Sequence, residues 1–254
     1  MILFENDSFM ILCKAFGEYQ TNCYLTIDKQ TDEALIIDPG IGASTWVIET
    51  LESKKPLAIL NTHGHFDHVW SNAELLSYFG KIPLLCPLED AFMLTEDCFS
   101  TGLPQSTPSL LVGGKEGETI ERKTANTENL GRENHYTLGN FIVEFSCYPG
   151  HTPGCSVIVL SSKLTNTDST SAQNASSQSE IPPLSQQKVM FSGDFIFHRS
   201  IGRSDFPYSS HSAMKASLEK FMERKENLLI LPGHGNTTSV AQEQANIPYW
   251  LARL

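Results

Sequence analysis

The sequence has 254 residues, 40% of them apolar and 19% charged, so the chain can bury a sizeable core and is not disordered as a whole. Asp and Glu outnumber Lys and Arg by 29 to 18, and the resulting formal net charge of −11 argues against nucleic acid as a partner, because phosphate binding needs a basic surface. No run approaches the roughly 18 uncharged apolar residues of a membrane span, so no membrane partner is expected.

Cysteine usage and the N-terminal residues favour the cytoplasm. Six cysteines are spread along the sequence, and none forms a Cys-x-x-Cys pair. This spacing offers neither a zinc ribbon nor a disulfide framework, and we expect free thiols in a reducing compartment. The N-terminal run MILFENDSFM is acidic where a secretory signal would be basic.

The first half of the chain alternates predicted strands and helices. Short Ile- and Leu-rich runs between turn residues predict strands, and helical spacing of Trp46, Val47 and Leu51 predicts a helix that ends before Pro56. The predicted strands cover residues 8–16, 22–28, 33–38, 57–60 and 83–86. The predicted helices cover residues 43–53, 69–79 and 89–99. Residues 113–134 are polar and predict a loop.

The second half resumes the strand pattern and ends in helices. The predicted strands cover residues 138–147, 155–160, 188–191 and 228–231. A helix is predicted over 211–224 with Ser210 as its N-cap, and a last one from Val240 onward.

A low-complexity segment interrupts this half. Residues 161–187 include 17 Ser, Thr, Asn or Gln among 27 and no aromatic residue, so they cannot bury enough surface to offset their ordering entropy. We predict a disordered surface insertion at 161–187. Candidate metal ligands lie on both sides of it, which favours a single domain over residues 1–254.

Four predicted strands end in the same way. A glycine or tight turn follows the strand, and a side chain that can bind a metal comes next. The four junctions are residues 62–68, Pro149-Gly150-His151, Ser192-Gly193-Asp194 and Pro232-Gly233-His234. Glycine allows a sharp turn, and neighbouring strands would bring these loops to one edge of the sheets.

The first junction carries the pattern His-x-His-x-Asp-His, formed by His63, His65, Asp67 and His68. Imidazole and carboxylate donors suit zinc, iron or manganese. In a tight loop, the first two histidines can face one ion while Asp67 and His68 face a second. We therefore expect two divalent ions, zinc in preference to iron or manganese. For His135, His198 and His211 we expect ordinary surface or helix-start positions instead.

The sequence resembles the metallo-β-lactamase-fold hydrolases, and among them the short, single-domain glyoxalase II-like group. The residues that carry the resemblance are Thr21-Asn22-Cys23-Tyr24-Leu25, Ile37-Asp38-Pro39-Gly40, 62–68, 149–154, Ser192-Gly193-Asp194, 201–207 and 231–235. The resemblance implies an α+β fold, a four-layer αββα sandwich of two mixed sheets with helices on the outer faces.

The resemblance also implies roles for individual residues. One metal would be bound by His63, His65 and His151, a second by Asp67, His68 and His234, and Asp194 would bridge the two. Asp38 would orient the first metal loop without touching a metal. Arg203 would bind an anionic substrate, unless it pairs with Asp205.

The implied activity is metal-dependent hydrolysis of a thioester. A hydroxide bridging the metals would attack the carbonyl carbon, with Asp67 and Asp194 as catalytic residues. The implied substrate is an S-(2-hydroxyacyl)glutathione or a similar small molecule, bound by a monomer in the cytoplasm. Divalent cations would make the site locally positive, so an anionic substrate is compatible with the acidic chain.

Other functions remain open. A sulfur (persulfide) dioxygenase of the same fold would use a single iron, and metal stoichiometry with oxygen uptake distinguishes it. A hydrolase of another ester or lactone is a second alternative. A class B β-lactamase is disfavoured by Asp194 in place of cysteine. A further alternative is a protein whose metals only stabilise the fold. The ligand set disfavours this alternative because it leaves room for water, whereas a structural metal site is closed.

Overall fold

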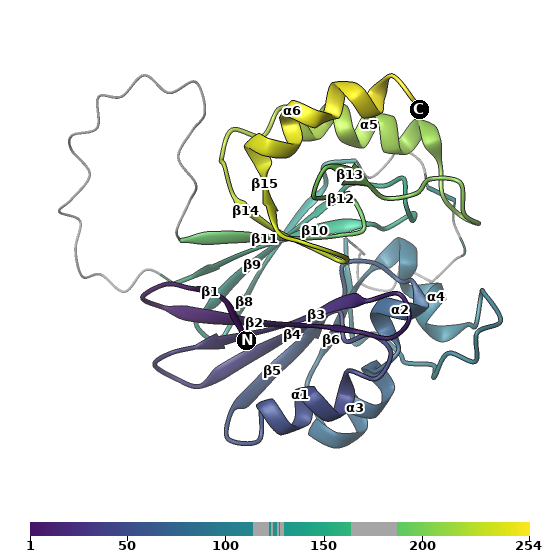
Figure 1. Cartoon of the computed structure of the whole chain (residues 1–254). Coiled ribbons are helices and arrows are strands. Elements are labelled where there is room, and N and C mark those ends of the chain that lie inside the picture. Colours follow the sequence, from purple (N-terminus) through teal and green to yellow (C-terminus); the bar gives the residue numbers. More distant parts are fainter. Residues whose placement is uncertain (114–121, 123, 126, 128–129, 164–186) are drawn as a thin grey trace, which may run out of the picture.

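The computed structural model describes residues 1–113, 122, 124–125, 127, 130–163 and 187–254 (Figure 1). Two β-sheets face each other, and helices cover the outer face of each sheet. The fold is the expected α+β sandwich with four layers, αββα.

The first sheet has seven strands in sequence order, β1 to β7. Its first four strands run antiparallel, and β4 to β7 are parallel, so the sheet is mixed. The strands are β1 (Ile2–Glu5), β2 (Phe9–Phe16), β3 (Thr21–Asp28), β4 (Glu33–Ile37), β5 (Lys55–Leu60), β6 (Leu84–Pro87) and β7 (Leu110–Val112).

The second sheet has six strands in the order β15-β14-β11-β10-β9-β8. Only its β11–β14 pair is parallel, so this sheet is mixed as well. The strands are β8 (Glu133–Leu138), β9 (Phe141–Cys147), β10 (Ser156–Ser162), β11 (Lys188–Gly193), β14 (Leu229–Pro232) and β15 (Thr238–Ser239). A separate two-stranded ribbon joins β12 (Ile196–Phe197) and β13 (Ser200–Ile201).

The helices divide between the two outer faces (Figure 1). Those of the first half lie beside the first sheet: α1 (Ser44–Thr50), α2 (Phe66–Val69), α3 (Asn72–Phe79), a 3₁₀ turn (Leu88–Asp90) and α4 (Ala91–Thr95). The last two, α5 (His211–Phe221) and α6 (Val240–Leu251), pack on the second sheet. No helix in the described ranges has the length and apolar character that a membrane crossing requires.

The described residues form three hydrophobic clusters, and strand β4 contributes to two of them. Leu35 and Ile37 point into the cluster between the sheets, whereas Ala34 and Ile36 point into the cluster beneath the helices. Alternate residues of a strand face opposite sides, and helices cover the outer side, so β4 is apolar on both faces. The Ile- and Leu-rich runs of the sequence reflect this double burial.

Several predicted boundaries are wrong. Strand β1 was not anticipated, and the predicted loop at 113–134 reaches into β8, whose residues are alternately half-buried and exposed. The helix expected over 89–99 is a 3₁₀ turn followed by the short α4. The helix expected over 69–79 is split into α2 and α3.

The first two residues of the predicted insertion at 161–187, Ser161 and Ser162, belong to strand β10 instead. Residues 164–186 lie outside the described residues, so the rest of the insertion stays a prediction. The strands on either side of them are antiparallel neighbours, with Ser161 paired to Lys188. The segment therefore connects two adjacent strands of the second sheet.

The cluster between the sheets gives a stability prediction. Phe141 is fully buried there, with its ring centroid 6.3 Å from that of Phe9. Phe141→Ala should lower the free energy of unfolding by about 3–5 kcal/mol, measured by urea denaturation. Its neighbour Ile142 is 38% exposed, and Ile142→Ala should cost about 1 kcal/mol or less. Equal losses in the two variants would contradict this placement of the core.

Candidate metal centre

All four predicted junctions meet at one edge of the sandwich. The first follows β5 of the first sheet, and the other three follow β9, β11 and β14 of the second sheet. They bring together two sets of metal-capable side chains, each with donor atoms within 4.8 Å of one another. The sets are His63, His65 and His151, and Asp67, His68 and His234.

The first set is fully enclosed. The Nε2 atoms of His63, His65 and His151 are buried and have no hydrogen-bond partner. Burial lowers the pKa of His63 and of His65 well below that of an exposed histidine, and the neighbouring histidines lower it further. The rings are therefore neutral, which is the form that binds metals.

Hydrogen bonds at Nδ1 orient the rings of His151 and His234. The Nδ1 atom of His151 donates to the backbone oxygen of Arg203 at 2.7 Å, and that of His234 donates to the backbone oxygen of Tyr19 at 2.9 Å. Burial lowers the pKa of His151, so its ring is neutral and, by donating from Nδ1, presents a lone pair at Nε2. Burial would also lower the pKa of His234, but the Asp194 carboxylate beside its Nε2 outweighs burial and raises that pKa.

The second set is partly open to solvent. The His234 side chain is 27% exposed, and its Nε2 lies 3.4 Å from Asp67 Oδ2 and 3.3 Å from His68 Nε2. Thr21 Oγ1 donates to Asp67 Oδ2 at 2.7 Å and fixes this carboxylate. The centre therefore opens on the His234 side.

Asp194 lies between the two sets. Its Oδ2 is 3.4 Å from His151 Nε2 and 3.3 Å from His234 Nε2, and its Oδ1 is 3.3 Å from His68 Nε2. Burial would raise the pKa of Asp194, but His68 and His234 outweigh it and hold the pKa well below the usual value. The carboxylate is therefore ionised and contacts both sets, as a bridging ligand requires.

The donor set fits divalent cations. Unpartnered imidazole nitrogens and an ionised carboxylate converge in a buried space, where nitrogen and oxygen ligands of this kind suit zinc, iron or manganese. Without a cation the lone pairs of these nitrogens would face one another. A positive ion between them makes the same arrangement favourable.

Asp38 hydrogen-bonds to the candidate ligand His68 and to Thr62. Its Oδ2 is 3.1 Å from His68 Nδ1 and accepts from Thr62 Oγ1 at 2.6 Å, while its Oδ1 accepts from the Thr62 backbone N–H at 2.8 Å. Because Thr62 Oγ1 donates its proton to Asp38, the same Thr62 oxygen accepts a hydrogen bond from His63 Nδ1 at 3.1 Å. One carboxylate thus orients His68 directly and His63 through Thr62.

Two glycines of the junctions act in different ways. Gly193 has φ +49°, so it makes the sharp turn that the sequence suggests. Gly233 instead allows close packing, because a Cβ there would lie 2.2 Å from Asp194 Oδ1 and 2.6 Å from His68 Cε1. A side chain at position 233 would displace the candidate ligands.

Asp90 supports the candidate site, and sequence reasoning missed it. It is fully buried and accepts from the Gly64 backbone N–H at 2.9 Å, from Thr152 Oγ1 at 2.6 Å and from the Gly154 backbone N–H. Burial raises its pKa to about 7, against the hydrogen bonds that lower it. Asp90 therefore joins the loop of His63 and His65 to the loop of His151. Its sequence signal is a pair of adjacent acidic residues, Glu89 and Asp90, within the otherwise apolar run 84–94.

The Arg203 side chain forms an ion pair outside the two ligand sets. It is 63% exposed, forms an ion pair with Asp205 at 2.8 Å, and its guanidinium lies 4.1 Å from the Phe206 ring centroid. Its direct contribution to the centre is the backbone oxygen that orients His151. A substrate-binding role for its side chain stays a prediction.

The three remaining histidines lie outside both sets. His135 is 60% exposed on β8, and His198 is exposed after β12. His211 begins α5, where its Nδ1 is 2.7 Å from Ser204 Oγ. These positions agree with the surface and helix-start positions expected for them.

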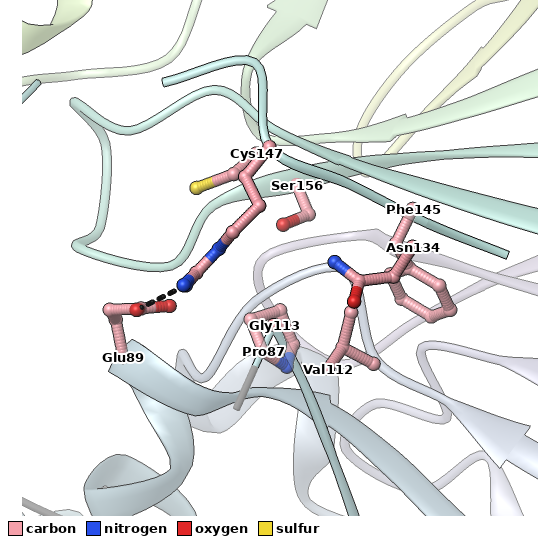
Figure 2. Close-up of a pocket in the computed structure, with 9 residues that line it drawn as sticks. Pro87, Glu89, Val112, Gly113, Asn134, Phe145, Cys147 and Ser156 are labelled. Atoms are coloured by element: carbon pink, nitrogen blue, oxygen red, sulfur yellow. Dashed lines mark hydrogen bonds and ion pairs between the residues drawn. The ribbon is translucent and has the colours of Figure 1, made fainter. Parts of the chain in front are cut away.

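A hollow lies among residues that include Glu89, Asn134, Phe145 and Cys147 (Figure 2). The buried Glu89 carboxylate lines it and forms an ion pair with Arg132 at 2.7 Å. None of the residues that line this hollow is a candidate metal ligand. The hollow is therefore separate from the two ligand sets.

The contacts of Asp90 lead to a prediction for metal retention. Asp90→Asn replaces an acceptor oxygen by a donor amide that faces donors, so the loops of the first set should loosen. Metal affinity should fall by about 10–100-fold, measured by competition with a chromophoric chelator. Asp32→Asn, which changes an exposed carboxylate, is the matched control. Equal affinity in both variants would show that Asp90 does not position the ligands.

Comparisons with known proteins agree with this geometry. The model of the metallo-β-lactamase superfamily matches residues 16–167. An uncharacterised protein of Mycobacterium tuberculosis is 30% identical over 92% of this chain and 94% of its own length. Hydroxyacylglutathione hydrolase GloC of Haemophilus influenzae is 29% identical over 91% of this chain and 93% of its own. The mouse mitochondrial persulfide dioxygenase ETHE1 is 26% identical over 89% of this chain and 70% of its own.

Solved structures show the same similarity. The B3 metallo-β-lactamase BLEG-1 is 28% identical with a TM-score of 0.67, covering 94% of this chain and 99% of its own. TTHA1623 in a di-iron-bound form is 25% identical with a TM-score of 0.60, over the same shares of 94% and 99%. With the matched family model and the paired His/Asp sets, these similarities show that the chain belongs to the metallo-β-lactamase superfamily.

Proposed function

We propose that this protein is a thioester hydrolase that works with two divalent metal ions, as in the glyoxalase II-like group. The observation that carries the proposal is the position of Asp194, whose carboxylate contacts His151 of the first set and both histidines of the second. A carboxylate shared by two sets of donors favours a two-metal site over a single structural ion. The similarity to GloC supports the thioester as substrate.

Bound metals, zinc in preference to iron or manganese, would acidify a water molecule and polarise the substrate carbonyl. The residues of the chain hold the geometry for this chemistry. Asp38 and the backbone oxygens of Arg203 and Tyr19 fix the histidine rings. Asp67, fixed by Thr21, faces His234 on the open side, and we propose that it orients the proton of the attacking water.

A thioester suits this site for a further reason. Its leaving group is a thiolate, whose conjugate acid has a pKa of about 8.5, so it departs without help from a strong general acid. The proposed substrate is a small molecule such as an S-(2-hydroxyacyl)glutathione, acted on by a monomer in the cytoplasm.

A persulfide dioxygenase is the second candidate, supported by the similarity to mouse ETHE1. That reaction needs one iron and consumes oxygen, whereas hydrolysis needs neither iron nor oxygen. A hydrolase of another ester or lactone is the third candidate, in line with the metallo-β-lactamase superfamily. A panel of thioesters, lactones and β-lactams separates the hydrolases from one another.

Removal of Asp194 tests the proposed role of this residue. Asp194→Ala should lower the metal content. It should also reduce thioester hydrolysis by more than the roughly 100-fold expected for a residue that only orients a metal ligand. The circular dichroism spectrum should stay unchanged. Asp7→Ala, at an exposed turn beyond β1, is the matched control. Wild-type turnover by Asp194→Ala would remove Asp194 from the site.

Metal removal tests the number of ions. Dialysis against a chelator should abolish hydrolysis, and titration with zinc should restore it in proportion to bound metal up to two equivalents per chain. Metal content is measured by plasma emission spectroscopy and oxygen uptake by an electrode on the same samples. Full activity with one iron per chain, together with oxygen consumption, would support the dioxygenase instead.

A further inference from the structure

Aromatic side chains from separate segments surround the metal centre. We call this set the aromatic rim; it consists of Tyr19, Phe66, Phe99, Phe197 and Phe206. Three of its rings contact candidate ligands directly, with centroid distances of 5.3 Å for Phe99 to His65, 6.1 Å for Phe206 to His151 and 6.0 Å for Phe197 to His234. The rim therefore contacts both sets of ligands.

Part of the rim is continuous. The ring of Phe66 lies 5.4 Å from that of Tyr19 and 6.2 Å from that of Phe99. Tyr19 is 56% exposed, and the other rim residues are half-buried. Phe197 and Tyr19 adjoin His234, the most exposed of the candidate ligands, through the Phe197 ring and the Tyr19 backbone oxygen. Apolar area thus remains accessible at the open side of the centre.

The charge beside the rim is already neutralised. The Arg203 guanidinium stacks on Phe206 at 4.1 Å, and both of its hydrogen bonds go to the Asp205 carboxylate. The positive charge of Arg203 is therefore compensated by Asp205. What the guanidinium adds to the rim is a flat surface stacked on Phe206. Ligand sites lined by aromatic rings with a few polar groups favour apolar ligands, because the rings shed water on contact.

We infer that the rim selects thioesters whose acyl group carries an aromatic ring or a similarly bulky apolar group over short acyl groups. This inference rests on the proposed thioester hydrolysis. In that reaction one water molecule splits the carbon–sulfur bond to give a carboxylate, a thiol and a proton, so no further reactant is required. Phe99 is the key selecting residue, because its ring touches both His65 and the neighbouring rim residue Phe66.

The test compares two substrates that share one thiol, phenylacetyl- and acetyl-N-acetylcysteamine, on the zinc-loaded protein. The kcat/KM for the phenylacetyl substrate should be at least about tenfold higher than that for the acetyl substrate. Phe99→Ala should lower this ratio by about tenfold or more, because discrimination of this size is expected when an apolar contact in a pocket is lost. Phe99→Leu keeps an apolar side chain and should retain part of the preference.

Tyr78→Ala is the matched control, because Tyr78 is a 60% exposed aromatic residue on α3, outside the rim. Its ratio should equal that of the wild type. A wild-type ratio near one, or equal ratios in Phe99→Ala and Tyr78→Ala, would overturn the rim as selector while thioester hydrolysis still stands.

Failure to hydrolyse any thioester would contradict the proposed function. In that case a binding measurement still tests the apolar selectivity of the aromatic rim. The zinc-loaded protein should bind phenylacetate more tightly than acetate by calorimetry, and Phe99→Ala should reduce this difference. Equal dissociation constants for the two carboxylates would overturn the apolar selectivity independently of turnover.

Discussion

The centre depends on a buried group of imidazole nitrogens that no hydrogen bond satisfies. Each buried polar atom without a partner costs about 1–3 kcal/mol, and the Nε2 atoms of His63, His65 and His151 share one space. A cation supplies the missing partner to all of them together. Metal binding should therefore also stabilise the folded chain, since the site does not exist in the unfolded state.

The two sheets set the spacing of this group. His63 to His68 follow β5 of the first sheet, whereas His151, Asp194 and His234 follow strands of the second. The centre thus straddles the packing interface, and the apolar cluster between the sheets fixes the distance between the ligand loops. Backbone contacts reinforce it: the Asn22 N–H donates to the Gly233 oxygen at 2.7 Å, and the Ser156 N–H donates to the Thr62 oxygen at 3.0 Å.

The strand ends were predictable because each carries its signal within a few residues, as in residues 62–68. The supports were not, because their partners are distant in sequence: Asp90 binds Gly64 across 26 residues and Thr152 across 62. Main-chain acceptors such as the Tyr19 oxygen carry no signal at all. Strand β8 was missed because polar residues alternate along an edge that is open to solvent on one face.

Strands β10 and β11 are described up to the residues that flank 164–186, and these flanking ends lie away from the metal centre. Ser161 pairs with Lys188 there, while Gly193 and Asp194 are at the other end of β11. The length of β11 therefore separates any added residues from the candidate ligands. We expect a domain fused between Ser162 and Lys188 to leave the ligand geometry unchanged, which makes this position suitable for protein engineering.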